Sequence, residues 1–266
     1  MGKGNITIIL AIIFVLFLSS TSYAMEEKSI LLLIDRLDFD VIEAISADTD
    51  FGIGFVNIKT RKPYVIESYY FSIAAGRKIG VNSSLYKGLY KDENGTIIVS
   101  GFEDMFKDST KGIKNVKIEV LGEKIKGQGI SYIGDNSSAI VAVDNTGTIK
   151  SGEIEVKYDN IWLNNKTNYH LSNSNLLVLS YNIDEINNRV KILKDYIDKF
   201  KDYNIIIVPN EVSKDMEYII NSSLVPIIYI HNDDNGMMSS LSTQREGYIT
   251  LEDIHAELLE VHGEKQ

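Results

Sequence analysis

The sequence predicts an α/β protein with a mostly parallel central sheet and helices on both faces. Two observations carry this prediction. Short apolar runs recur along the chain, and segments with the 3.6-residue period of an amphipathic helix lie between them. Strands buried on both faces of a parallel sheet have continuous apolar runs of this kind, because helices cover both of their sides.

The first predicted strand is Ser29–Ile34, a continuous apolar run that ends at Asp35. Similar runs are predicted as strands at residues 97–99, 131–133, 139–143, 176–179, 205–208 and 225–230. Strand and helix therefore alternate along the chain, which is typical of a mostly parallel sheet.

The clearest predicted helix is 183–200, where apolar residues fall three or four positions apart. A second helix is predicted over 116–126, ended by Gly127 and Gly129. A third covers 67–77, with Ser68 in its first turn and Gly76 at its end.

Two turn patterns, 92–95 and 144–147, each precede a Thr-Ile pair and are typical of hairpin tips. The Asn-rich stretch 157–175 favours an irregular crossing loop. The stretch 233–236 resembles a calcium loop only superficially, because the alternating oxygen ligands and the closing glutamate are missing, so a plain turn is expected.

The N-terminal segment has the order of a secretory signal. Lys3 precedes an apolar run from Ile6 to Leu18, and small and polar residues then lead to Ala24. The run is shorter than the roughly 20 residues that cross a bilayer. We therefore predict a signal peptide over 1–24, cleaved after Ala24, with an uncleaved membrane anchor or a buried core helix as alternatives.

The remaining residues, 25–266, have the length and composition of a single domain in the extracytoplasmic space or cell envelope. Cysteine is absent from the chain, which excludes disulfides, catalytic thiols and cysteine-ligated zinc. The formal net charge of -10 argues against nucleic acid or anionic lipid as a partner, since both are bound through clustered Lys and Arg. Membrane contact is expected only through an uncleaved N-terminal segment.

Asp35 is the first candidate functional residue. Ligands of open α/β sheets bind at the carboxyl ends of the strands, and Asp35 directly follows the first one, with Asp38 and Asp40 close behind. A carboxylate there can bind a metal or a substrate. The alternative is a helix N-cap or a first-turn acid that faces the helix dipole.

Ser68 is the second candidate. A serine at a helix N-terminus is placed where free backbone N–H groups stabilise a developing anion, so Ser68 could serve as a nucleophile. It is equally placed to be a cap, and the neighbouring sequence supplies no general base.

The order of several segments resembles a known family. Ile34-Asp35 is followed by 52–57, by the Ser68–Arg77 segment, by 121–134, by 225–228 and by Gln244–Ile254, with its Thr-Leu-x-Asp-Ile run. This order resembles the alkaline phosphatase superfamily across nearly all of residues 25–266. More narrowly, it is similar to a group of exported Gram-positive bacterial proteins that carry a phosphatase-like extracytoplasmic domain.

The resemblance implies a catalytic centre with two metal ions, at which Asp35 would be a ligand. Active members carry an Asp-His pair after a late strand, and here the matching place reads Pro209-Asn210-Glu211. Glu211 remains a candidate metal ligand, whereas His170, His231, His255 and His262 do not fall at ligand positions. The resemblance therefore indicates a degenerate member, a pseudoenzyme.

Three functions are consistent with these observations. The favoured one is an exported, non-catalytic binding, sensing or scaffold module at the cell envelope. The alternative is a hydrolase or transferase of phosphate, sulfate or lipid-linked esters with an altered zinc or manganese site, built from Asp35, Ser68 and Glu211. The third is a structural envelope protein.

Overall fold

The computed structural model describes residues 27–46, 49–111, 118–183, 188–213, 223–231 and 235–264. The predicted signal peptide over 1–24 lies outside these ranges. Within them, no helix is long and apolar enough to span a bilayer.

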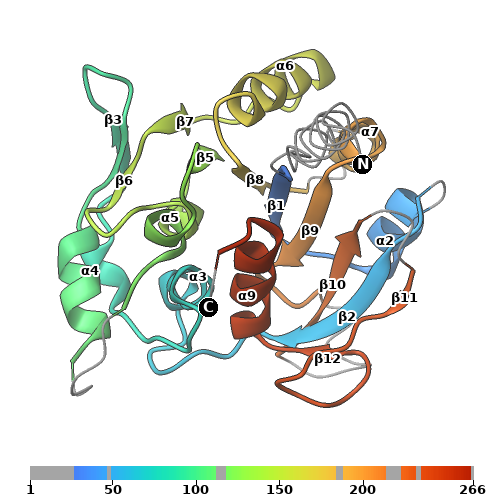
Figure 1. Cartoon of the computed structure of the whole chain (residues 1–266), viewed down its shortest axis with the longest axis horizontal. Coiled ribbons are helices and arrows are strands. Elements are labelled where there is room, and N and C mark those ends of the chain that lie inside the picture. The colour runs from blue at the N-terminus through green and yellow to red at the C-terminus, as the bar shows by residue number, and fades with distance from the viewer. Residues whose placement is uncertain are drawn as a thin grey trace, which may run out of the picture.

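In the described residues, nine strands form one sheet in the order β11-β2-β10-β9-β1-β8-β5-β7, with β12 also paired to β2 (Figure 1). Its strands are β1 Ser29–Ile34, β2 Gly52–Asn57, β5 Ile130–Ile133, β7 Ser151–Glu153, β8 Leu176–Tyr181, β9 Asn204–Pro209, β10 Leu224–Ile230, β11 Gly236–Met237 and β12 Tyr248–Ile249. Only the pairs that β10 makes with β2 and β9 are antiparallel. The predicted mostly parallel α/β sheet is confirmed.

The helices in this part of the chain are α2 Phe39–Ser46, α3 Ile66–Ala75, α4 Phe102–Ser109, α5 Leu121–Lys124, α6 Asn160–Leu171, α7 Arg189–Phe200 and α9 Leu251–Val261. Short 3₁₀ turns occur at η1 Ser83–Leu85 and η2 Ser137–Val141. A small second sheet of β3 Leu89–Lys91, β4 Ile97–Val99 and β6 Thr148–Ile149 lies beside the β7 edge (Figure 1).

The central strand β1 divides the core into two layers. Its side chains alternate, so Leu31 and Leu33 face one hydrophobic cluster and Ile30, Leu32 and Ile34 face the other. The first cluster includes side chains of α3, α5 and α9, and the second includes side chains of α2, α6 and α7. Helices therefore cover both faces of the sheet, as the apolar run of β1 predicts.

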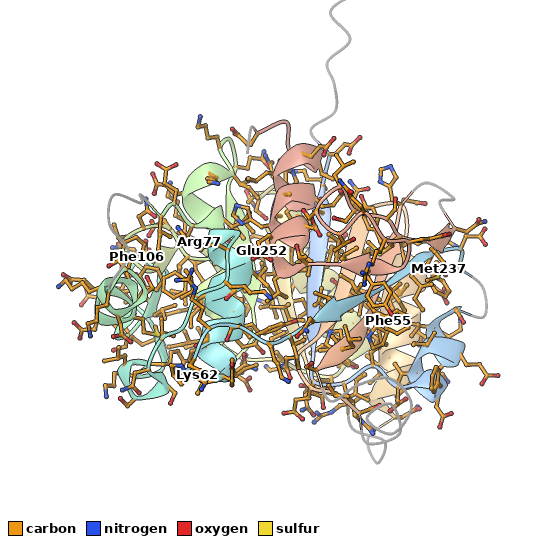
Figure 2. The ribbon with its side chains drawn as sticks, turned by 90° about the horizontal axis from the view of Figure 1, so that it is seen from below. Phe55, Lys62, Arg77, Phe106, Met237 and Glu252 are labelled. Carbon is orange, nitrogen blue, oxygen red and sulfur yellow. The ribbon has the colours of Figure 1, made fainter. Side chains whose placement is uncertain are left out.

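Helices α3 and α9 lie side by side on one face (Figure 1). The end of α3 is fixed by Gly76, whose φ of 60° is left-handed and whose added Cβ would come within 2.6 Å of the His255 ring. Figure 2 shows Arg77 near Glu252, where the end of α3 meets the start of α9, and the Lys78 N–H donates to Glu252 Oε1 there at 3.2 Å. The predicted helix with Ser68 in its first turn and Gly76 at its end is confirmed.

One predicted loop is wrong. The stretch 157–175 contains the helix α6, although Asn has low helix propensity. The side chain of Asp159 accepts the Trp162 N–H and caps the helix, and Leu163 and Leu171 are buried against the core. Capping and burial of one helical face thus outweigh the intrinsic preference of the asparagines.

The predicted strand 139–143 is also wrong, because η2 occupies most of it. Five buried residues in a row suit a strand or a buried helical turn equally, so periodicity could not separate them. The Asn136 side chain accepts the Ser138 N–H and starts the turn. As a result 144–147 is a tight turn between η2 and β6, whereas 92–95 is the predicted hairpin tip between β3 and β4.

Two predicted helices are shorter than expected. Residues 118–120 are not helical, and α5 covers only Leu121–Lys124 of the predicted 116–126. Helix α7 begins at Arg189, after Asn188 in a left-handed conformation, and residues 184–187 of its predicted start lie outside the described residues. Residues 233 and 234 of the predicted turn 233–236 lie outside them as well.

Candidate functional site

The carboxyl ends of four neighbouring parallel strands meet along one edge of the sheet. Asp35 follows β1, Asn182 follows β8, Asn136 comes soon after β5, and Asn210 and Glu211 follow β9. Adjacent parallel strands end at the same edge, so these polar side chains gather there. We call this group the carboxyl edge.

The Asp35 side chain connects the end of β1 to the end of β8 through hydrogen bonds. Its Oδ1 accepts the Ile183 N–H at 2.7 Å, and its Oδ2 accepts the Asn182 side-chain amide at 3.2 Å. Partial burial raises the pKa of Asp35, while hydrogen bonds from the backbone of Ile183, Asp35 and Arg36 act against that rise. Asp38, rather than Asp35, caps α2 by accepting the Val41 N–H.

The end of β9 lies against the same strand end. The backbone N–H groups of Asn210 and Glu211 donate to the carbonyls of Ile34 and Asp35, each at 3.0 Å. The structure therefore brings the predicted metal candidates Asp35 and Glu211 next to each other through the backbone. The Glu211 side chain is exposed to solvent.

Two tyrosines of α3 join that helix to the carboxyl edge. The Tyr69 hydroxyl donates to the Pro209 carbonyl at 2.8 Å, and the Asn210 amide donates to the Tyr70 hydroxyl at 2.7 Å. Burial raises the pKa of Tyr70, and the nearby carboxylates of Glu211, Glu67 and Asp35 raise it further. The phenol therefore stays protonated and can donate a hydrogen bond at neutral pH.

Ser68 is placed differently. It is fully buried, its hydroxyl accepts the Val81 N–H at 2.9 Å, and it donates to the Pro63 carbonyl at 3.0 Å. Among the described residues, no hydrogen bond joins Ser68 to Asp35 or Glu211. The serine ties the loop after α3 to the segment before it, and the N-cap position of α3 belongs to Val65.

A cavity of about 510 Å³ opens between the carboxyl edge and the first turn of α3. Its described lining is rich in amides, phenols and hydroxyls, namely Thr60, Tyr64, Tyr69, Tyr70, Asn136, Ser137, Asn210 and Ser223. Lys59 and Glu211 supply one charge of each sign in that lining. Cavities of this size commonly hold small molecules.

The donor set at the carboxyl edge does not fit a two-metal centre. Both Asp35 oxygens already accept N–H groups, one from the Asn182 side-chain amide and one from the Ile183 backbone, and both groups are uncharged. Over the ranges that the structure describes, no three His, Asp or Glu side chains are grouped so that they could hold a metal ion.

The four histidines lie elsewhere in the fold. His170 hydrogen-bonds Ser151, His255 contacts α3 and Lys124, His231 hydrogen-bonds Asn204, and His262 follows α9. None of them is in the described lining of the carboxyl-edge cavity.

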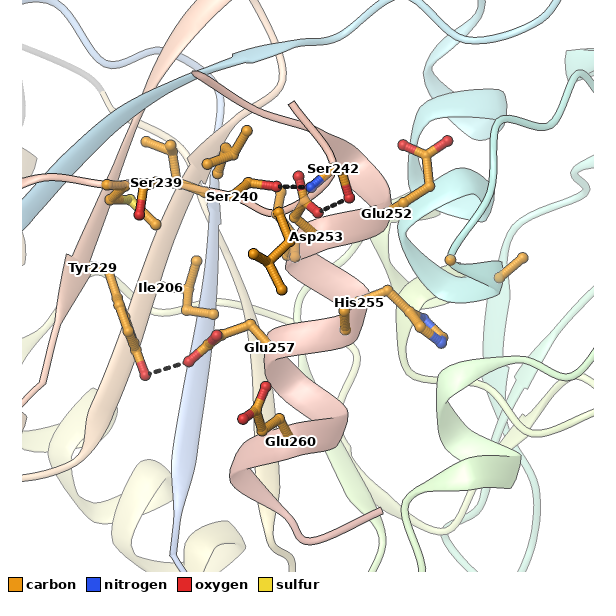
Figure 3. Close-up of a pocket in the computed structure, with 18 of the residues that line it drawn as sticks. Ile206, Tyr229, Ser239, Ser240, Ser242, Glu252, Asp253, His255, Glu257 and Glu260 are labelled. Carbon is orange, nitrogen blue, oxygen red and sulfur yellow. Dashed lines mark hydrogen bonds between the residues drawn. The ribbon is translucent and has the colours of Figure 1, made fainter. Parts of the chain in front are cut away.

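A second cavity, of about 530 Å³, lies between α9 and the sheet (Figure 3). Its apolar wall includes Ile206, and two of the four carboxylates in its described lining accept hydrogen bonds from neighbouring hydroxyls. Tyr229 donates to Glu257 at 2.8 Å, and Ser242 donates to Asp253 at 2.6 Å. These bonds fix α9 against the sheet and the preceding loop.

Sequence reasoning missed several residues of the carboxyl edge. Asn136 and Asn182 follow strands, so the strand-end rule that selects Asp35 would have found them if it had been applied to every strand. Tyr69 and Tyr70 directly follow the candidate Ser68, but nothing in a helical sequence pattern shows that their hydroxyls reach the ends of the strands.

Comparison with known proteins does not identify a function for this site. No protein-family model matches the chain, and a search of curated proteins finds no match. Among solved structures, the C-terminal periplasmic domain of phosphoethanolamine transferase EptC from Campylobacter jejuni is similar over 90% of each chain, at 10% identity and a TM-score of 0.44. Similarity at this level assigns neither a family nor a function.

Proposed function

We propose that the protein is an exported binding module that holds a neutral, hydroxyl-rich ligand of the saccharide class in the carboxyl-edge cavity, without metal-dependent catalysis there. The observation that carries this proposal is the hydrogen bond between Asn210 and Tyr70 in a lining of amides, phenols and hydroxyls. Such groups both donate and accept, as sugar hydroxyls do.

Two further features support a neutral ligand. The charged side chains in the described lining, Lys59 and Glu211, balance each other, so the cavity has no excess charge that would select an ion. Tyr64 also lines the cavity and is 60% exposed, so its ring is free to pack against the apolar face of a sugar ring.

The place of action follows from the predicted signal segment. A binding module exported by that segment would meet the glycans and other polymers of the cell envelope. Of the three roles expected from the sequence, binding is the one that the cavity supports.

Calorimetric titration with a panel of oligosaccharides tests this proposal. We expect saturable binding by the wild type and at least tenfold weaker binding by Tyr64→Ala and by Asn210→Ala, a loss of about 1.4 kcal/mol. Tyr90→Ala is the matched control, because Tyr90 is 50% exposed but lies in the small sheet outside the cavity. Equal affinity of all four proteins would contradict the proposal.

The alternative is a metal-dependent hydrolase or transferase, and the same preparations address it. Stoichiometric binding of zinc or manganese, together with hydrolysis of a phosphate ester that Asp35→Asn abolishes, would replace the binding proposal. We expect no metal-dependent hydrolysis, because the Asp35 oxygens are already occupied by N–H donors.

A further inference from the structure

Away from the carboxyl edge, a serine, a histidine and a glutamate stand in a row. The Ser151 hydroxyl lies 2.9 Å from His170 Nδ1, and His170 Nε2 lies 3.6 Å from Glu153 Oε1. Ser151 and Glu153 come from the edge strand β7, and His170 comes from the last turn of α6. The two elements face each other across these three side chains.

The serine is the member of the row that can meet a ligand. Ser151 is partly exposed and lines a cavity of about 470 Å³, together with Lys126, Gln128, Thr148, Lys150 and Asn173. Residues 127–130 lead into β5 and Lys150 precedes β7, so this cavity lies at the amino ends of two parallel strands. It is therefore at the opposite edge of the sheet from Asp35.

His170 lies behind Ser151, is buried, and lacks a hydrogen-bond partner at one of its ring nitrogens. His170 is 2% exposed, and its Nε2 makes no hydrogen bond in the described structure. Because Nδ1 can accept the Ser151 proton, the tautomer that suits this geometry carries its own proton on Nε2, on the side of Glu153. A buried N–H without a hydrogen-bond partner is destabilising. The Nε2–H of His170 is stabilised by the Glu153 carboxylate when the imidazole ring becomes positively charged.

Glu153 is held in place by two lysines. Its Oε1 pairs with Lys166 at 2.5 Å and its Oε2 with Lys91 at 2.9 Å. These contacts lower the pKa of Glu153 to about 2 in spite of its partial burial, so it is ionised at neutral pH. The carboxylate is thus fixed and negative at the Nε2 side of the imidazole.

We propose that Ser151, His170 and Glu153 form a second, esterolytic site, in which Ser151 is the nucleophile, His170 the general base and Glu153 a positioning residue. A separation of 2.9 Å between nucleophile and base is within the range for direct proton transfer. The two ring nitrogens exchange the roles that they have in the serine-protease triad, in which Nε2 faces the serine.

The reaction is hydrolysis of a carboxylic ester with water as co-reactant. Ser151 Oγ bonds to the carbonyl carbon while its proton passes to His170 Nδ1, and the alcohol leaves with that proton. Water then attacks the acyl-serine with the same base, which releases the acid and restores the hydroxyl. The polar cavity lining favours a short acyl group on a polar alcohol.

The surroundings of His170 determine the acid limb of the pH–rate profile, that is, the pH below which the reaction slows. Burial lowers its pKa, the Glu153 carboxylate opposes this, and the charges of Lys166 and Lys91 lower it further. The Tyr169 ring packs edge-on to the imidazole. His170 is therefore neutral and able to accept a proton at neutral pH. The rate is expected to fall only below pH 6.5, the usual pKa of histidine.

Labelling of the full chain with a fluorophosphonate probe, read by intact mass and peptide mapping, tests the site. We expect one adduct, on Ser151, that forms at a rate rising with pH to a plateau by neutral pH. Ser151→Ala should remove it, and His170→Gln should slow it by about a hundredfold. Ser172→Ala, an exposed serine at the end of α6, is the control and should label at the wild-type rate.

Glu153→Gln separates positioning from simple packing. Since the Glu153 carboxylate raises the pKa of His170, its removal should move the acid limb to lower pH as well as slow the labelling. A residue that only packs would leave the limb in place. Absence of an adduct on Ser151 in the folded wild type, or labelling that His170→Gln does not slow, would overturn the proposal. Neither result depends on saccharide binding at the carboxyl edge.

Discussion

At the scale of single residues, Ser68 and His255 show how burial decides what a polar side chain can do. The Ser68 hydroxyl hydrogen-bonds the backbone of Pro63 and Val81. His255, a residue of α9, is enclosed by α3 and α5. Both residue types are common catalytic groups. Here Ser68 joins the segments on either side of α3, whereas His255 connects segments that are far apart in the sequence.

Replacing Ser68 tests its structural role. Ser68→Ala leaves the buried Val81 N–H without its acceptor, which should lower the free energy of unfolding by about 1–3 kcal/mol. Urea denaturation followed by circular dichroism measures the change. Ser83→Ala, at an exposed position in η1, serves as the control and should change stability by less than about 0.5 kcal/mol.

His255 should make stability depend on pH. Burial and the neighbouring Lys124 lower the pKa of His255 to about 4, below its usual 6.5. Between these values the unfolded chain binds the proton first, so the free energy of unfolding falls as pH drops from 6.5 towards 4. The loss is on the order of 3 kcal/mol at most.

Urea midpoints of the wild type and of His255→Gln, compared between pH 4 and 7, isolate this contribution. The difference between the two proteins should change with pH only below about 6.5. A constant difference across the whole range would mean that His255 titrates normally in the folded protein.

At the scale of elements, α9 depends on its first turn. Thr250 and Asp253 form a capping box, in which the Thr250 hydroxyl accepts the Asp253 N–H and the Asp253 carboxylate accepts the Thr250 N–H. The same Asp253 carboxylate accepts the Ser242 hydroxyl and so fixes the preceding loop. One cap therefore serves both the helix and the wall of the cavity beneath it.

Removing that cap should have a limited cost. Thr250→Ala is expected to destabilise the protein by about 1 kcal/mol, visible as a lower melting temperature in calorimetry. Glu260→Gln, at an exposed position near the end of the same helix, should leave the melting temperature almost unchanged. Equal effects of the two substitutions would argue against the cap.

The elements also show what sequence patterns can and cannot predict. Buried strands such as β1, β8 and β9 were predictable because a helix-covered strand has a continuous apolar run. The helix α6 was not, since its Asn-rich composition favours a loop and only contacts with the core and the Asp159 cap make it helical. Likewise, η2 is as apolar as a strand and differs from one only in its hydrogen bonds.

At the scale of the whole molecule, the sheet determines which predicted site residues meet. Asp35 and Glu211 are adjacent because β1 and β9 are parallel neighbours, which the order of segments in the sequence does not reveal. Tyr69 and Tyr70 reach the same edge from α3, where they hydrogen-bond Pro209 and Asn210 at the end of β9. Such residues become visible as part of a site only once the chain is folded.

The central claim is that the carboxyl edge binds a saccharide without a metal ion. The most direct test is an NMR titration of the isotope-labelled protein with the tightest-binding oligosaccharide, in the presence of a metal chelator. We expect saturable shifts at the amides of residues that line the cavity, among them Thr60, Tyr64, Asn136 and Asn210. Shifts that appear only after zinc or manganese is added, or that fall away from this cavity, would contradict the account.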